Sequence, residues 1–78
     1  MIENNHNQNL SGVRLKEWRE KKQLSQLELA KRLGVTQPSV SQFESGARPG
    51  SPKFRLQFIL TFGRKTYNEI FAEELEPA

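Results

Sequence analysis

The side chains best suited to chemistry lie close together in T-Q-P-S-V-S-Q-F-E-S, residues 36–45, which is rich in amides and hydroxyls. These groups donate and accept hydrogen bonds, but they form no nucleophile–base pair and no set of metal ligands. The chain has no cysteine or aspartate and a single histidine, His6, which excludes thiolate chemistry, Cys-containing zinc sites and multi-histidine sites. We therefore expect recognition rather than catalysis: no enzyme, no catalytic residue, no metal and no cofactor.

The charge of the chain is unevenly distributed. All twelve Lys and Arg and five of the nine Glu lie in residues 1–65, which carry +7, whereas the other four Glu give residues 66–78 a charge of −4. A basic body favours a polyanionic partner such as nucleic acid, and the acidic end is expected to face away from it. Small domains can also be basic by chance, so charge alone does not decide between these two interpretations.

The length of 78 residues and mass of 9.0 kDa allow one small domain. No apolar run approaches the ~20 residues that a membrane span requires, and the first ten residues, MIENNHNQNL, lack the features of a secretory signal. We expect a cytoplasmic protein with no membrane partner. Its expected organisation is a flexible N-terminal arm over residues 1–10, a folded domain over 11–75 and a C-terminal tail over 76–78.

Capping signals predict five short helices, and no alternating apolar pattern predicts a strand. The clearest signal is S-Q-L-E, residues 25–28, a capping box. In this motif the Ser hydroxyl accepts the backbone N–H of Glu, and the Glu carboxylate accepts the backbone N–H of Ser, at the start of one helix. The expected helices are Ser11 to about Lys22, Ser25 to Gly34, Thr36 or Gln37 to Ser45, Ser51-Pro52 to about Phe62, and a last helix opened by a Thr66–Glu69 capping box. The predicted fold class is all-α, a compact five-helix bundle.

The second and third helices are separated by only about three residues, Gly34-Val35-Thr36, as in a helix-turn-helix. Glycine at the corner can take a left-handed conformation that a side chain would strain. Ala30 is small where the third helix must approach the second closely. These residues predict a helix-turn-helix formed by helices two and three.

Helical spacing of ~100° per residue divides the third helix into two faces. The inward set is Thr36, Val40, Phe43 and Glu44, and the outward set is Pro38, Ser41, Gln42 and Ser45, with Ser39 on the flank and Gln37 at the tip. An outward face of small and amide side chains suits the major groove of DNA, where Gln can pair with adenine N6 and N7.

The stretch LKEWREKKQLSQLELAKRLGVTQPSVSQFESGARP resembles the lambda-type repressor/Cro (Xre) helix-turn-helix family. The matching motifs are LKxWRE, LSQxELAxxLGV, T-Q-x-S-V-S and F-E-x-G-x-x-P, in order and at the family spacing. The resemblance covers residues 13 to about 49 well and residues 50–75 more loosely. It implies a lambda-repressor-like fold that binds double-stranded DNA through helix three.

The resemblance also assigns roles to individual residues. The residues expected to face base edges are Gln37, Gln42, Ser41 and Pro38, of which Pro38 either contacts a thymine methyl group or only fixes the helix start. The residues expected to face the DNA backbone are Gln26, Ser39, Arg48, Lys53 and Arg55. Backbone contacts position the protein and add affinity but carry little sequence information.

Arg19 and Glu44 are interpreted as a pair. Glu44 points inward on a helix whose other inward residues are mainly apolar, and a buried carboxylate needs a partner. Arg19 occupies the position that supplies this partner in the family. We expect a structural bridge between helices one and three.

The predicted function is sequence-specific regulation of transcription, by a dimeric repressor that occludes a promoter at a palindromic operator. The candidate dimer contact is Tyr67, Ile70 and Phe71, which could equally close the core of the monomer. The alternative function is an antitoxin that binds a partner toxin protein and represses its own operon; a restriction-modification controller is a further relative.

Overall fold

The computed structural model describes residues 10–71, and its elements follow the capping signals of the sequence closely. Five α-helices succeed one another: α2 (Leu10–Lys21), α3 (Gln26–Leu33), α4 (Gln37–Ser45), α5 (Pro52–Phe62) and α6 (Arg64–Ile70). Residues 10–71 contain no strand, so the predicted all-α, five-helix class is confirmed for the described part of the chain.

Side-chain caps start the three central helices. The Ser25 hydroxyl accepts the Glu28 N–H at 3.0 Å and the Glu28 carboxylate accepts the Ser25 N–H at 2.7 Å, which confirms the predicted capping box. Thr36 caps α4 by accepting the N–H of Ser39, and Ser51 caps α5. Helices this short are unstable in isolation, so satisfying their end groups matters.

Two predicted caps are wrong. Ser11 lies inside α2, which already begins at Leu10, and its side chain is buried rather than placed at a helix end. Likewise, α6 begins at Arg64, directly after Gly63, so Thr66 lies inside the helix instead of capping it. The reason is Gly63, whose φ of 95° and ψ of 157° turn the chain sharply and allow its carbonyl to accept the Tyr67 N–H at 3.1 Å.

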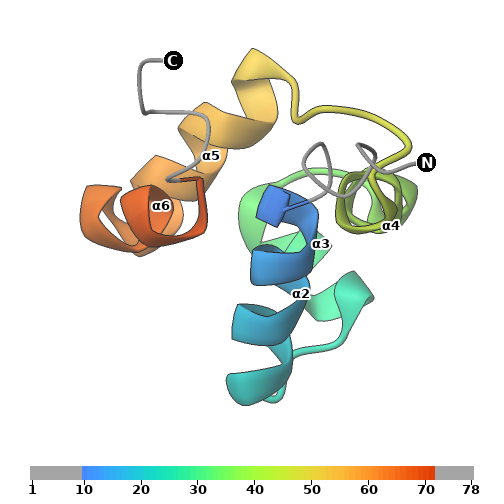
Figure 1. The fold of residues 1–78 in the computed structure, drawn as a ribbon. Helices are drawn as coiled ribbons and strands as arrows, with labels where there is room; N and C mark the ends of the chain where they lie inside the picture. Colours follow the sequence, from blue (N-terminus) through green and yellow to red (C-terminus); the bar gives the residue numbers. More distant parts are fainter. Residues whose placement is uncertain (1–9, 72–78) are drawn as a thin grey trace, which may run out of the picture.

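The core is formed by all five helices, which pack in pairs: α3 against α4 and α5, α2 against α4 and α6, and α5 against α6 (Figure 1). Phe58 is at the centre, fully buried, with its ring 5.4 Å from that of Trp18 and 5.9 Å from that of Phe71. Edge-to-face contacts of this kind stabilise aromatic pairs beyond the area they bury. The aromatic cluster therefore joins the first helix to the last two.

The candidate dimer contact must be corrected. Tyr67, Ile70 and Phe71 are 7%, 3% and 0% exposed, and the Tyr67 and Phe71 rings stack 4.3 Å apart inside the core. They are buried because α6 needs their apolar surface to pack on α2 and α5. These residues close the monomer and leave almost no surface for a second copy.

The arm predicted over residues 1–10 and the tail predicted over 76–78 lie outside the described residues, except for Leu10, which belongs to α2. The end of the predicted domain, from residue 72 to 75, also lies outside them.

The capping box makes the stability of the protein depend on pH. The backbone N–H of Ser25, and then its hydroxyl, lower the pKa of the Glu28 carboxyl from its ordinary 4.5. A lowered pKa in the folded state means that ionised Glu28 stabilises the fold above pH ~4.5, and that this contribution is lost as the pH falls through the lowered pKa. We expect Glu28→Gln to unfold more easily than wild type near pH 7, and the gap in free energy of unfolding to shrink near pH 3. Urea titrations of both proteins at the two pH values test this, and an equal gap at both would contradict it.

Candidate nucleic-acid interface

The corner between α3 and α4 brings two short helices together over three residues. Gly34 ends α3 with a φ of 73°, and the Val35 N–H returns to the Ala30 carbonyl at 3.0 Å. Ala30 is 1% exposed on α3, the helix that packs against α4. A larger side chain at Ala30 would hold the two helices apart, because buried side chains there are already close-packed.

Helix α4 has a buried face and an outward face. Val40, Phe43 and Glu44 are buried, as expected, but Thr36 is exposed. Thr36 is the N-cap, with an extended backbone (φ −86°, ψ 155°), so the helical spacing that predicted an inward position does not apply to it. On the other side, the exposed residues are Pro38, Gln42 and Ser45, and the half-buried ones are Gln37, Ser39 and Ser41. The outward face of α4 therefore presents amides, hydroxyls and one proline.

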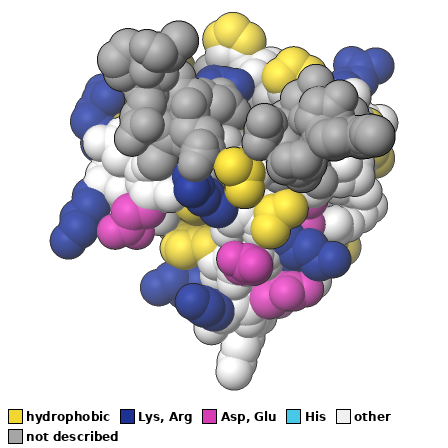
Figure 2. All heavy atoms as spheres, viewed as in Figure 1, with side chains coloured by type: hydrophobic (Ala, Val, Ile, Leu, Met, Phe, Trp, Pro, Cys, Tyr) yellow, Lys and Arg dark blue, Asp and Glu magenta, His cyan; other side chains and the backbone are white. Residues whose placement is uncertain are grey.

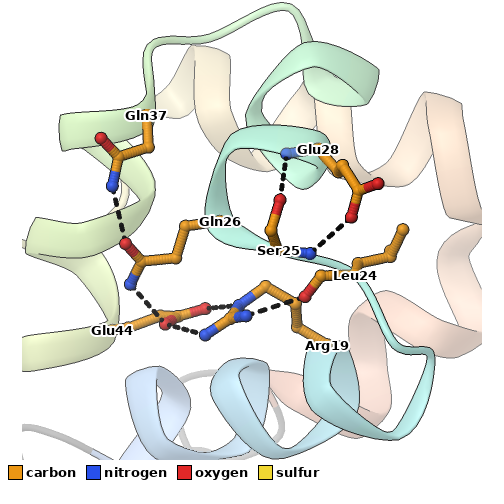
Figure 3. Close-up of polar contacts among 7 residues, drawn as sticks. All are labelled: Arg19, Leu24, Ser25, Gln26, Glu28, Gln37 and Glu44. Atoms are coloured by element: carbon orange, nitrogen blue, oxygen red, sulfur yellow. Dashed lines mark hydrogen bonds and ion pairs between the residues drawn. The ribbon is translucent and has the colours of Figure 1, made fainter.

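The inward carboxylate of α4 is held by an arginine from α2. Arg19 Nε donates to Glu44 Oε2 at 2.7 Å and Arg19 Nη2 donates to Glu44 Oε1 at 3.0 Å, a bidentate arrangement (Figure 3). The third guanidinium nitrogen, Nη1, donates to the Leu24 carbonyl at 2.8 Å. Hydrogen bonding to Glu44 raises the pKa of the Arg19 guanidinium, although desolvation by burial opposes it.

Two glutamines extend this bridge to the tip of α4. Gln26 Nε2 donates to Glu44 Oε1 at 3.0 Å, and Gln37 Nε2 donates to Gln26 Oε1 at 2.7 Å (Figure 3). An ionised carboxylate can only accept, so it orients the Gln26 amide, which in turn presents its oxygen to Gln37. The Gln37 amide is thereby oriented through two steps from a buried charge.

Gln26 was predicted to face the DNA backbone and Gln37 a base edge, but the hydrogen bond between them was not predicted from the sequence. Both stand at the first position of a helix, and the two helices are joined by a three-residue corner. This shared position is the signal that could have predicted the hydrogen bond between them. The structure brings both of these predicted DNA-facing residues into one network with the predicted ion pair.

Three of the other candidates for the DNA backbone lie on the exposed side of the domain. Ser39 and Arg48 line one cavity of about 140 Å³ between α4 and the loop that follows it, together with the base-reading candidate Gln42, and Lys53 is exposed in the first turn of α5. Arg55 is different: its Nε donates to the Gly50 carbonyl at 3.0 Å and its guanidinium lies 5.4 Å from the Phe71 ring. Arg55 is thus half-buried and engaged by Gly50 and Phe71 of its own domain, unlike the exposed Arg48 and Lys53.

The exposed surface of α2 carries charges of both signs, unlike the uncharged outward face of α4. Lys16, Glu17, Glu20 and Lys21 are exposed along this helix, and Figure 2 shows acidic and basic side chains interspersed on the face in view. Interspersed charges produce no extended basic field. Within residues 10–71, there is no group of three or more side chains that could together bind a metal ion. No helix in this part of the chain is long and apolar enough to cross a membrane.

A short corner between two capped helices, with an outward polar face on the second, defines the helix-turn-helix class of DNA-binding domains. A family model described as helix-turn-helix matches residues 15–56, more than half of the chain, from within α2 to within α5. The chain belongs to this helix-turn-helix family, of the lambda-repressor (Xre) type, as the motifs indicated. Searches of curated proteins and of solved structures found no match. The family is a DNA-binding, non-enzymatic one whose members regulate transcription, and this chain is a regulator of that general class.

Removing the Glu44 carboxylate should damage the fold. Glu44→Ala would leave the Arg19 guanidinium, whose side chain is 9% exposed, without its counter-charge, and we expect a loss of about 3–5 kcal/mol in the free energy of unfolding. Urea titration measures this loss. The control is Glu17→Ala, an exposed glutamate on α2, which should change stability by less than about 0.5 kcal/mol. Equal stabilities of the two variants would show that the bridge does not hold the helices together.

Proposed function

We propose that the protein is a sequence-specific repressor that binds double-stranded DNA as a dimer, with α4 in the major groove. The observation that carries the proposal is the outward face of α4, where amide and hydroxyl side chains are presented without any charge. Glutamine and serine can read base edges there, because each base pair shows a distinct pattern of donors and acceptors in the major groove.

The electrostatics of α4 support this role. Glu44 is the single acidic residue of the helix, and it is 6% exposed and paired with Arg19. A carboxylate on the outward face would repel the phosphates, so its place inside the domain leaves α4 compatible with a polyanion. Arg48 in the following loop and Lys53 at the start of α5 are exposed and would contact phosphates on either side of the groove.

Gln37 is the residue we propose for adenine. Its hydrogen bond to Gln26 uses one N–H of an amide that has two, and its carbonyl oxygen takes no part in that bond. A bidentate pair with adenine needs one N–H, toward N7, and one oxygen, toward N6. The contact with Gln26 therefore orients the amide without consuming the groups that would read the base.

Gln26 would serve the DNA backbone from the start of α3. Its amide gives one N–H to Glu44 and its oxygen to Gln37, which leaves a second N–H that can meet a phosphate. Gln42 and Ser41, farther along α4, would contact the next base pairs. Pro38 is exposed in the first turn, where it could meet a thymine methyl group.

Two copies are proposed because one α4 reaches only a few base pairs. Helix-turn-helix dimers bind half-sites about one helical turn apart, ~34 Å, so the operator should be palindromic. A dimer on a promoter would repress transcription by occluding it. Selection of binding sequences from a randomised duplex pool, followed by titration of the selected site, tests the proposal directly. Binding should weaken steeply with salt as counterions are released, and failure to enrich any sequence would oppose it.

Substitution of Gln37 tests base reading. We expect Gln37→Ala to weaken binding to the selected site by about 1–3 kcal/mol and to leave binding to random DNA nearly unchanged, because only the specific complex uses the amide. Fluorescence anisotropy with labelled duplexes measures both affinities.

Arg48→Ala is the matched comparison, since Arg48 is exposed in the loop that follows α4 and is proposed for phosphate. It should weaken both complexes to a similar extent and reduce the salt dependence. If Gln37→Ala behaved in the same way, Gln37 would be a backbone contact.

A further inference from the structure

A second, larger cavity lies where α2, α3, α5 and α6 meet. Its volume is about 350 Å³, which falls within the range of about 300–1,000 Å³ typical of small-molecule sites. The residues that line it come from the ends of α2, α3 and α5, from the segment before α3 and from the first turn of α6; they are Trp18, Lys22, Leu24, Arg32, Phe62 and Thr66. None of these six residues is proposed to contact DNA, so the cavity is separate from the nucleic-acid interface.

The wall of this cavity is largely aromatic. Trp18, Leu24 and Phe62 are half-buried and pack against the core from its edge. The Trp18 ring is held edge to face by two others, 4.9 Å from Phe62 and 5.4 Å from Phe58. Contacts of this geometry fix the rings, so the part of their surface that remains exposed is a preformed apolar wall suited to a flat ring.

Two cations lie at the same cavity. Lys22 and Arg32 are exposed, and Lys22 Nζ lies 6.0 Å from the centre of the Trp18 ring. In the described part of the chain no carboxylate lines the cavity, and Glu28, one turn before Arg32, already accepts the Ser25 N–H at 2.7 Å. An apolar wall beside charges of one sign concentrates their field, so the cavity favours an anion.

The helix ends around the cavity weaken this field only in part. A helix C-terminus carries a partial negative charge of about half a unit, which arises from carbonyls without a partner. At the end of α2 the Trp18 carbonyl accepts the Lys22 N–H at 3.1 Å. At the end of α3 the Leu33 carbonyl accepts an N–H of the Gln57 side chain, also at 3.1 Å. Because these carbonyls are occupied, the full charges of Lys22 and Arg32 dominate at the cavity.

We propose that this cavity binds a small aromatic carboxylate, with its ring against Trp18 and Phe62 and its carboxylate beside Lys22 and Arg32. The aromatic wall supplies apolar contact and the two cations supply the counter-charge. The occupant is a small molecule rather than a protein, because a stable protein interface buries ~800 Å² per partner and the apolar residues here line a single cavity. The inference goes beyond the proposed function and does not depend on it.

Trp18 allows binding to be observed at the cavity itself. It is the single tryptophan of the chain, so a proton–nitrogen correlation spectrum contains one indole N–H signal. The probe is naphthoate, and the control is naphthamide, which has the same ring and nearly the same shape but no charge. We expect naphthoate to shift the indole signal saturably and to bind at least threefold more tightly than naphthamide. An indole signal that naphthoate does not shift, or equal affinities for the two compounds, overturns the proposal.

Charge-removing variants test the two cations. We expect Lys22→Gln and Arg32→Gln each to weaken naphthoate binding by about three- to fivefold, which is the range of an exposed ion pair. The matched controls are Lys21→Gln and Lys31→Gln, which remove the same charge from exposed neighbours outside the cavity lining and should leave the affinity unchanged. Equal weakening by all four variants would indicate attraction to a basic surface in general and would contradict a site in the cavity.

DNA binding of the same variants separates this site from the proposed function. If Lys22→Gln and Arg32→Gln weaken DNA binding and leave naphthoate binding unchanged, the two cations serve phosphates and the cavity proposal is wrong. If naphthoate binds as expected while wild type binds no selected DNA, the proposed function fails and the cavity site stands.

Discussion

The buried pair of Arg19 and Glu44 is the interaction on which the arrangement of α2, α3 and α4 depends. Its two hydrogen bonds, at 2.7 and 3.0 Å, cross from α2 to α4, and a third reaches the Leu24 carbonyl just before α3. Neither ion could be buried alone, because desolvation of an unpaired charge costs several kcal/mol. A bidentate contact tolerates little displacement, so the pair fixes the positions of α2, α4 and the residue before α3 relative to one another.

The pair matters because the helices themselves are short. Helices of seven to twelve residues do not persist in water, so each depends on its caps and on its neighbours. The Ser25–Glu28 box, the Thr36 cap and the Ser51 cap satisfy end groups locally, and the aromatic cluster around Phe58 supplies the packing. Caps fix where the helices begin, the core brings them together, and the buried bridge sets the orientation of α4 that the outward face needs.

Local signals explain how much could be predicted from the sequence. The capping box at Ser25, the glycine at the α3–α4 corner and the two faces of α4 depend on residues a few positions apart, and these predictions agree with the structure except at Thr36. The start of α6 was mispredicted because Gly63 and the burial of Tyr67 override a favourable local cap. The Gln26–Gln37 hydrogen bond joins residues eleven positions apart, and the only sequence signal for it is that both stand at the first position of a helix on either side of a short corner. The contact of Arg55 with the Phe71 ring joins residues sixteen positions apart and required the tertiary fold.

The network that stabilises the domain also reaches the residue proposed to read DNA. From the core outward it runs through Glu44, Gln26 and Gln37, and each amide is oriented by the one before it. Because the carboxylate accepts only, reversing the Gln37 amide would break a hydrogen bond or require Gln26 to reverse as well, against the charge of Glu44. A preoriented amide loses less conformational entropy on binding, so the interaction that holds the helices together also favours discrimination at the surface. If Gln37 reads a base as proposed, stability and specificity in this small domain are coupled through one buried charge.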